Sequence, residues 1–387
     1  MDKFKTRTWA EVDLDAIAKN LQNIKSLAGE NPKILCVVKA DAYGHGFLKI
    51  AETVLENGAD GLAVATFEEA RALRKSGILK PVLVMGNTNV DLAEDMVKYD
   101  ISAAITDEML ATAMSNAAVA QNKIAKFHIK LDTGMSRIGF SCDEEGVLRI
   151  KTICSLPNIC AEGLFSHFSC ADEKDRTMTD WQFKNFMYVA DALEKENIKF
   201  SYRHICNSAG IMAYPEYYLD MVRPGIILYG LYPSDELDAS KLSLIPAMTV
   251  KTRITRIVEK DSDVPVSYGA TYRTSKKTKL ATVPIGYADG YIRCMSGSAF
   301  MSVNGVQVPV VGRICMDQCM IDVSSVNNIN VGDEVIVFGN GGDNSITVNS
   351  LSKNAGTVPH EILALTGNRT PRIYIKDGKV IDVLTYF

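Results

Sequence analysis

The sequence predicts an α/β protein in which an N-terminal (β/α)8 TIM barrel is followed by a mainly antiparallel β domain. Over roughly the first 230 residues, short apolar runs alternate with helix-like segments. After about residue 240, alternating β-branched residues and glycine or asparagine turns take over. The length of 387 residues suits one large domain or two ordinary ones.

Eight apolar runs define the predicted barrel strands. They cover residues 34–39, 61–66, 81–86, 101–106, 127–132, 161–167, 203–208 and 225–230. Continuous apolar runs of this length are typical of parallel strands that are buried on both faces. Eight strands favour a closed barrel over an open doubly wound sheet, and no GxGxxG follows the first run.

Helix signals lie between the runs. Thr66 and Glu69 have the spacing of a capping box, and Gly77 stands where a C-cap glycine is expected. Thr179 and Gln182 predict a second helix start of the same kind.

The second domain is predicted from runs that alternate in hydrophobicity. These runs are 247–260, 279–290, 301–324 and 331–342. We expect the barrel to cover residues 10–240 and the β domain to cover 241–387, with residues 1–9 packing on the β domain.

Composition excludes several classes of protein. With 47% hydrophobic and 23% charged residues and a net charge of −4, the chain has no basic face for nucleic acid. No apolar stretch is long enough to span a membrane, and the N-terminus lacks the apolar core of a signal peptide, so a cytoplasmic protein is expected. The nine cysteines, including Cys36, Cys160 and Cys206 in apolar runs, are expected to be buried free thiols, and no metal-site spacing is present.

Polar residues gather at the carboxyl ends of the predicted strands, where barrel enzymes place their chemistry. Lys39 ends the first run, Lys130 lies in the fifth, His167 ends the sixth, Ser208 ends the seventh and Arg223 precedes the eighth. Each has an ordinary alternative, such as a solvated lysine or a hydrogen-bonded histidine. Their convergence on one mouth favours a site. His45, which can simply bond within its own turn, and His128 and His204 carry no motif.

Eight motifs in sequence resemble the bacterial alanine racemase family. They are VVKADAYGHG, KLDTGMSRIGF, SHFSCAD, NSAG, MVRPGIILYG, SYGATY, GYADGY and GRICMDQCMIDV, in the family's order. The resemblance covers nearly the whole chain, and the set is far more specific than any single motif. It implies the same barrel and β domain.

The resemblance implies pyridoxal 5′-phosphate as cofactor, bound covalently to Lys39. The groups it assigns to the phosphate are Tyr43, Ser208, the backbone N–H groups of Gly225 and Ile226, and His360. Arg223 would face the pyridine nitrogen, which it leaves unprotonated because a guanidinium only donates hydrogen bonds.

The resemblance also implies two catalytic bases, one for each face of the substrate. Lys39 would serve one face and Tyr268 the other, supported by His167 and Arg223. The family's tyrosine comes from a second subunit, so a homodimer with shared sites is implied, with Met316 and Tyr287 from the same side. The activity implied is the interconversion of L- and D-alanine, which supplies D-alanine for peptidoglycan.

Three further residues concern the substrate. By resemblance, Arg137 binds the substrate carboxylate, and Lys130 is a lysine that is often carbamylated in the family and then orients this arginine. His360 departs from the family, which usually has tyrosine there. We hypothesise that histidine admits a more polar substrate such as serine, against the simpler alternative of a neutral change.

Three alternative functions stay open. One is a serine or broad-specificity racemase. Another is a decarboxylase that depends on pyridoxal 5′-phosphate (PLP). Arg223 and the SYGATY motif argue against it. The last is a non-catalytic PLP-binding protein, which would lack the second domain and its tyrosine.

Overall fold

The computed structural model describes residues 2–5, 7–339 and 345–386. The chain forms two compact units. One comprises Met1–Ile17, Asp41–Gly46 and Ile245–Phe387, and the other comprises Ala18–Ala40 and Phe47–Leu244.

The second of these, the barrel unit, is built on eight parallel strands in the order β8-β7-β6-β5-β4-β3-β2-β9. The strands are β2 (Lys33–Val37), β3 (Gly61–Val64), β4 (Val82–Val84), β5 (Ser102–Ile105), β6 (Ala125–Lys130), β7 (Ile159–Phe165), β8 (Tyr202–His204) and β9 (Met221–Val222). Two backbone hydrogen bonds join the ends of this series, from Asp220 N to Arg203 O at 3.0 Å and from Arg223 N to Cys206 O at 3.1 Å. The predicted eight-stranded barrel is therefore confirmed.

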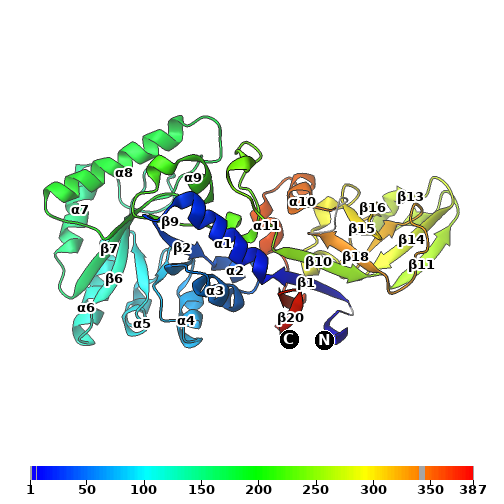
Figure 1. The fold of residues 1–387 in the computed structure, drawn as a ribbon, viewed down its shortest axis with the longest axis horizontal. Coiled ribbons are helices and arrows are strands. Elements are labelled where there is room, and N and C mark those ends of the chain that lie inside the picture. The colour runs from blue at the N-terminus through cyan, green and yellow to red at the C-terminus, as the bar shows by residue number, and fades with distance from the viewer. Residues whose placement is uncertain (1, 6, 340–344, 387) are drawn as a thin grey trace. The chain divides into compact units, whose positions relative to one another are not determined.

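Helices cover the outside of this sheet (Figure 1). They are α1 (Leu14–Ala28), α3 (Phe47–Glu56), α4 (Phe67–Lys75), α5 (Ala93–Lys98), α6 (Glu108–Ala120), α7 (Glu144–Cys154), α8 (Thr177–Lys195) and α9 (Ser208–Ala213), with 3-10 turns η2 (Val90–Leu92), η3 (Pro215–Tyr217), η4 (Ile226–Tyr229) and η5 (Ala239–Lys241). The capping box of Thr66 and Glu69 is present at the start of α4, and Gly77 follows its end with φ +92°.

Three expectations about this unit were wrong. The eighth run, 225–230, forms the buried turn η4, and the eighth strand is β9, which Arg223 follows. Helix α8 begins two residues before Thr179. The capping box predicted there does not form, because the amide of Gln182 accepts from Ser169 N and donates to His167 O. All nine cysteines are free thiols, but only Cys36, Cys206 and Cys319 are buried as expected, and Cys160 and Cys294 are exposed.

The other unit, the β unit, contains a sheet of ten strands in the order β11-β14-β17-β16-β15-β18-β10-β1-β19-β20. They are β1 (Thr8–Asp13), β10 (Met248–Arg253), β11 (Arg256–Lys260), β14 (Thr278–Val283), β15 (Phe300–Val303), β16 (Val306–Val311), β17 (Cys319–Asp322), β18 (Glu334–Phe338), β19 (Arg372–Lys376) and β20 (Lys379–Leu384). Only β1 and β19 pair in parallel, so the sheet is mainly antiparallel as predicted. Of the predicted run 331–342, the last three residues lie outside the described residues.

Shorter elements complete the β unit. They are the hairpin β12 (Pro265–Val266) and β13 (Tyr272–Arg273), helices α10 (Val348–Ala355) and α11 (Pro359–Ala364), and 3-10 turns η1 (Asp2–Phe4), η6 (Tyr268–Ala270), η7 (Tyr287–Asp289) and η8 (Arg293–Met295). Within the described residues, every helix is too short or too polar to cross a membrane.

Candidate active site

Lys39 does not end a strand, as the sequence suggested. Strand β2 ends at Val37, and Lys39 begins a single turn, α2 (Lys39–Gly44). Residues 40–43 of this turn are not glycine, yet each has φ between 52° and 54°. This left-handed conformation costs free energy for L-residues, so the surrounding structure must hold it.

Side chains of the β unit contact this turn along residues 41–46. The guanidinium of Arg372 donates from Nε to Gly44 O at 2.9 Å, and the Tyr386 hydroxyl donates to the Asp41 carboxylate. The Nδ1 of His45 lies 3.0 Å from Ala42 O, so this histidine has the ordinary role of bonding within its own turn. Together these contacts fix the segment that follows Lys39.

The Lys39 amine is adapted to act as a nucleophile and a base. Burial and the positive charge of Arg137 lower its pKa, while Glu69 opposes the shift. Glu69 also accepts from Ala40 N at 2.7 Å and so anchors the start of the turn. A larger fraction of this amine is therefore neutral at physiological pH than for an ordinary lysine.

Arg223 is buried beneath the mouth of the barrel. Its Nη1 donates to His204 Nδ1 at 2.7 Å, and its Nη2 donates to Ser166 O at 2.8 Å and Ile205 O at 3.0 Å. Burial lowers its pKa to about 10, which still leaves the guanidinium charged at neutral pH. The side chain is thus a fixed, buried donor.

His167 lies between two donors. Arg223 Nη2 is 3.4 Å from its Nδ1, and Asn207 Nδ2 is 3.3 Å from its Nε2. A doubly protonated ring would find no acceptor in either neighbour. Burial and the charge of Arg223 accordingly hold the pKa of His167 well below its usual value, so the imidazole is neutral.

Lys130 and Arg137 are joined by one loop. The carboxylate of Asp132 accepts from Gly134 N at 3.0 Å and Ser136 N at 2.9 Å, and this shapes the turn that carries Arg137. Lys130 is buried and donates to Leu131 O at 2.5 Å. Burial and the charge of Arg223 lower the pKa of Lys130 to about 7.

A polar cradle lies at the start of α9 and η4. Asn207 caps α9 by accepting from Gly210 N at 3.0 Å, and Ser208 Oγ accepts from Gly225 N at 2.9 Å. Ile226 is the first residue of η4, where an N–H group has no partner inside its own helix. The structure therefore brings Ser208, Gly225 and Ile226 together.

Two residues predicted near the phosphate meet in the β unit. The rings of Tyr43 and His360 have centroids 5.8 Å apart and are tilted by 47°. Tyr43 is buried, which raises its pKa and keeps its hydroxyl protonated as a donor.

The remaining predicted residues are large and exposed. Tyr268 is 70% exposed, Met316 52% and Tyr287 40%. Other large apolar side chains of this chain are also exposed, such as Leu79 at 89%, but here the exposure concerns all three residues predicted to act beside a second subunit.

Their backbones are interlocked. Ser267, directly before the exposed tyrosine, donates from Oγ to Arg313 O at 2.5 Å, and Tyr287 N donates to Cys315 O at 3.1 Å. Both acceptors belong to the segment 313–316. The three exposed side chains therefore stand on one connected set of loops.

The sequence interpretation missed His204 and His128. His128 Nδ1 lies 2.8 Å from His204 Nε2, which continues the chain of contacts that begins at Arg223. One signal was available: His128 and Lys130 are two residues apart on β6 and so share a face. The glycine at position 163 makes room, because a Cβ there would lie 2.2 Å from His128 Nδ1.

Known proteins resemble this chain over almost its full length. The family described as "Alanine racemase, N-terminal domain" matches residues 12–233, and "Alanine racemase, C-terminal domain" matches residues 247–374. The alanine racemase of Clostridium perfringens is 47% identical over 386 residues, covering 100% of both chains. A crystal structure of the alanine racemase of Clostridium difficile 630 is 40% identical with a TM-score of 0.95, covering 98% of this chain and 99% of that one. The structure of the same protein in complex with cycloserine is 38% identical to this chain, with a TM-score of 0.92.

Proposed function

The chain belongs to the alanine racemase family, a family of pyridoxal 5′-phosphate-dependent isomerases, and we propose how its residues interconvert L- and D-alanine. When bound, the cofactor supplies an electron sink that makes the Cα proton of an amino acid removable. Binding, orientation and proton transfer fall to the side chains of the protein.

The residues present fit this cofactor. Lys39 offers an amine whose pKa is lowered, which a covalent link to an aldehyde requires. Ser208 Oγ and the N–H groups of Gly225 and Ile226 form a cradle suited to a phosphate, which would take the Gly225 N–H over from Ser208 Oγ. Tyr43, kept protonated by burial, adds a donor.

Arg223 is the observation that carries the proposal. It is buried, charged and held by three acceptors, so it would offer the ring nitrogen of a bound cofactor a donor and no acceptor. Opposite such a donor, the ring nitrogen would stay unprotonated, and the cofactor would be a weak electron sink. A weak electron sink would favour removal and return of one proton at Cα over reactions in which the electrons stay on the cofactor for longer. A decarboxylase would place a carboxylate here.

Racemisation needs a proton acceptor on each face of Cα. Lys39, which would hold the cofactor through its amine, would serve one face. Tyr268 serves the other, with the neutral imidazole of His167 as its hydrogen-bond partner. A tyrosine has an unperturbed pKa near 10, so it needs such a partner to act as a base.

A second copy of the chain brings Tyr268 to this site in our proposal. The exposure of Tyr268, Met316 and Tyr287 supports a homodimer, because side chains of this size gain free energy when another surface covers them. The interlocked loops that carry them give the partner's site a rigid wall.

Arg137 binds the substrate carboxylate through its planar fork. Lys130, whose pKa burial and the charge of Arg223 lower to about 7, is neutral at pH 7 far more often than an ordinary lysine and can add CO2. Its nitrogen bonds to carbon, one C=O π bond opens, and a proton leaves to solvent. The carbamate replaces a repelling cation with an anion that orients Arg137.

His360 favours a second candidate substrate. It lies beside Tyr43, and an imidazole there can hydrogen-bond where the family's usual tyrosine presents a larger ring. L-Serine is then accepted alongside L-alanine.

The test of the function is incubation of the purified enzyme with L-alanine in heavy water. We expect D-alanine to appear with deuterium at Cα. A yellow protein that produces neither D-alanine nor deuterium exchange would instead be a cofactor-binding protein without racemase activity.

A further inference from the structure

A pocket of about 280 Å³ opens at the amino-terminal end of the barrel strands, away from the carboxyl ends that carry Lys39 and Arg223. The first residues of six strands line it, among them Lys33, Tyr202 and Met221. It therefore lies outside the racemase site described above.

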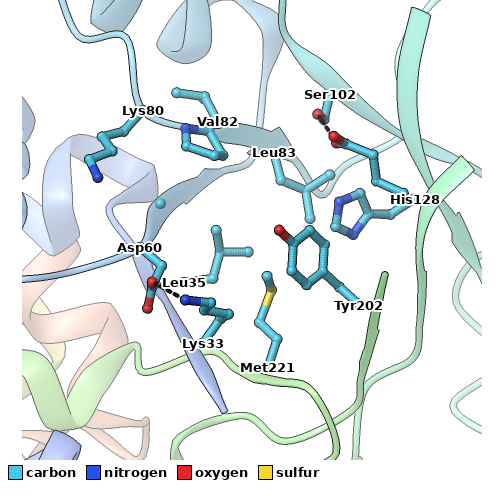
Figure 2. A pocket seen from close by; sticks show the side chains of 13 residues that line it. Lys33, Leu35, Asp60, Lys80, Val82, Leu83, Ser102, His128, Tyr202 and Met221 are labelled. Atoms are coloured by element: carbon cyan, nitrogen blue, oxygen red, sulfur yellow. Dashed lines mark hydrogen bonds and ion pairs between the residues drawn. The ribbon is translucent and has the colours of Figure 1, made fainter. Parts of the chain in front are cut away.

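The inner wall of the pocket holds a buried histidine. His128 is only 5% exposed, its ring stacks on Tyr202 at 6.3 Å, and it lines the pocket (Figure 2). Its Nδ1 faces His204, while its Nε2 has no hydrogen-bond partner among the described residues. Although the ring is buried, this atom is reached from the pocket, and a ligand there can pair with it.

Hydrogen-bond directions show that this atom is a donor. Arg223 can only donate, so His204 Nδ1 accepts and the neutral His204 carries its proton on Nε2. His204 Nε2 then donates to His128 Nδ1, which places the His128 proton on Nε2. Burial lowers the pKa of His128 to about 3, in keeping with a neutral ring. The ligand must therefore present an acceptor here.

The opposite wall of the pocket carries a positive charge. Lys33 is paired with Asp60 at 3.1 Å, but Lys80 has no ion pair among the described residues. Figure 2 shows these three side chains across the pocket from His128. An anionic group is favoured beside Lys80 and disfavoured beside His128, where the Glu162 carboxylate also lines the pocket.

Apolar side chains lie between the two ends. Leu35, Leu83 and Met221 line the middle of the pocket, so the body of the ligand is hydrocarbon. We propose, as a site separate from the racemase centre, that this pocket binds a small monocarboxylate that bears a neutral carbonyl at its other end.

Three molecules of equal chain length test this. Levulinate has both groups, valerate lacks the carbonyl, and methyl propyl ketone lacks the carboxylate. Calorimetry is run on the cofactor-loaded enzyme with saturating alanine at racemic equilibrium, so that the centre containing Arg137 is occupied. This arrangement rests on the proposed function, but the heat of binding does not depend on turnover.

We expect levulinate to bind with a Kd of about millimolar order, and valerate and the ketone to bind about three- to tenfold more weakly. Lys80→Met should weaken the binding of levulinate by a similar factor. The control variant Lys75→Met, at an exposed residue at the end of α4, should leave the affinity for levulinate unchanged. Equal binding of the three molecules, no binding of levulinate, loss of binding in saturating alanine, or equal effects of the two lysine variants would each overturn the proposal. An enzyme that racemises alanine but fails these tests leaves the proposed function intact.

Discussion

Arg223 Nη1 donates to His204 Nδ1 at 2.7 Å, and this contact fixes the direction of every hydrogen bond behind it. Because both side chains are buried, no water replaces a lost partner easily. The orientation of the Arg223 guanidinium thus depends on His204, a residue that we do not place in contact with the substrate.

Replacing this histidine separates positioning from packing. His204→Leu leaves a buried charged N–H without its acceptor, and we expect kcat/KM to fall roughly tenfold to a hundredfold. The absorption band of the bound cofactor should shift, since the donor to its ring nitrogen moves. His204→Gln retains an acceptor and should recover most of both properties. Equal losses in the two variants would show that His204 only fills space.

Carbamylation of Lys130 should depend on pH in a defined direction. Only the neutral amine adds CO2, and the pKa of about 7 means that this form increases as pH rises through neutrality. With ¹³C-labelled bicarbonate, we expect a carbamate resonance that grows between about pH 6 and pH 8. Lys130→Gln is the control and should lack it. A resonance that persists in this variant, or is absent from the parent enzyme, contradicts the assignment.

Glycine at position 163 should be required by the histidine beside it. A Cβ would lie 2.2 Å from His128 Nδ1, so Gly163→Ala should lower the free energy of unfolding by about 1–3 kcal/mol. Urea unfolding measures this. In the background of His128→Ala the same change should cost much less, because the clash is gone. Strictly additive losses would place the effect of Gly163 elsewhere.

The identity of residue 360 should affect substrate choice. His360→Tyr restores the ring usual in the family beside Tyr43, and we expect the ratio of L-serine to L-alanine turnover to fall. Measuring kcat/KM for both amino acids in both proteins decides this. An unchanged ratio means that the substitution is neutral.

Much of the barrel could be predicted because its strands are continuous apolar runs. The eighth strand could not be predicted in this way. Hydrophobicity indicates burial and not secondary structure, and both β9 and the turn η4 are buried. Pro224 and Gly225 separate the two and mark the break in hindsight. In the same way, the apolar run around Cys160 did not reveal that its thiol is exposed.

Some residues of the candidate site could also be predicted from the sequence, and some of their contacts could not. Positions such as Lys39 and Ser208 follow from the rule that barrel chemistry gathers at strand ends. The contacts of Arg223 with His204, and of His204 with His128, join residues on separate strands, and no spacing within one chain segment predicts such pairs. The left-handed turn after Lys39 was also hidden, because its residues are ordinary L-amino acids held by distant side chains.

We propose that two bases, Lys39 and Tyr268, serve opposite faces of Cα. The most direct test measures Cα deuterium exchange in heavy water with Tyr268→Phe, starting separately from L-alanine and D-alanine. We expect exchange to persist for the one enantiomer whose proton faces Lys39. It should fall by about 10²–10⁴-fold for the other, with the cofactor still bound. Equal exchange of both enantiomers, at the rate of the parent enzyme, would contradict it.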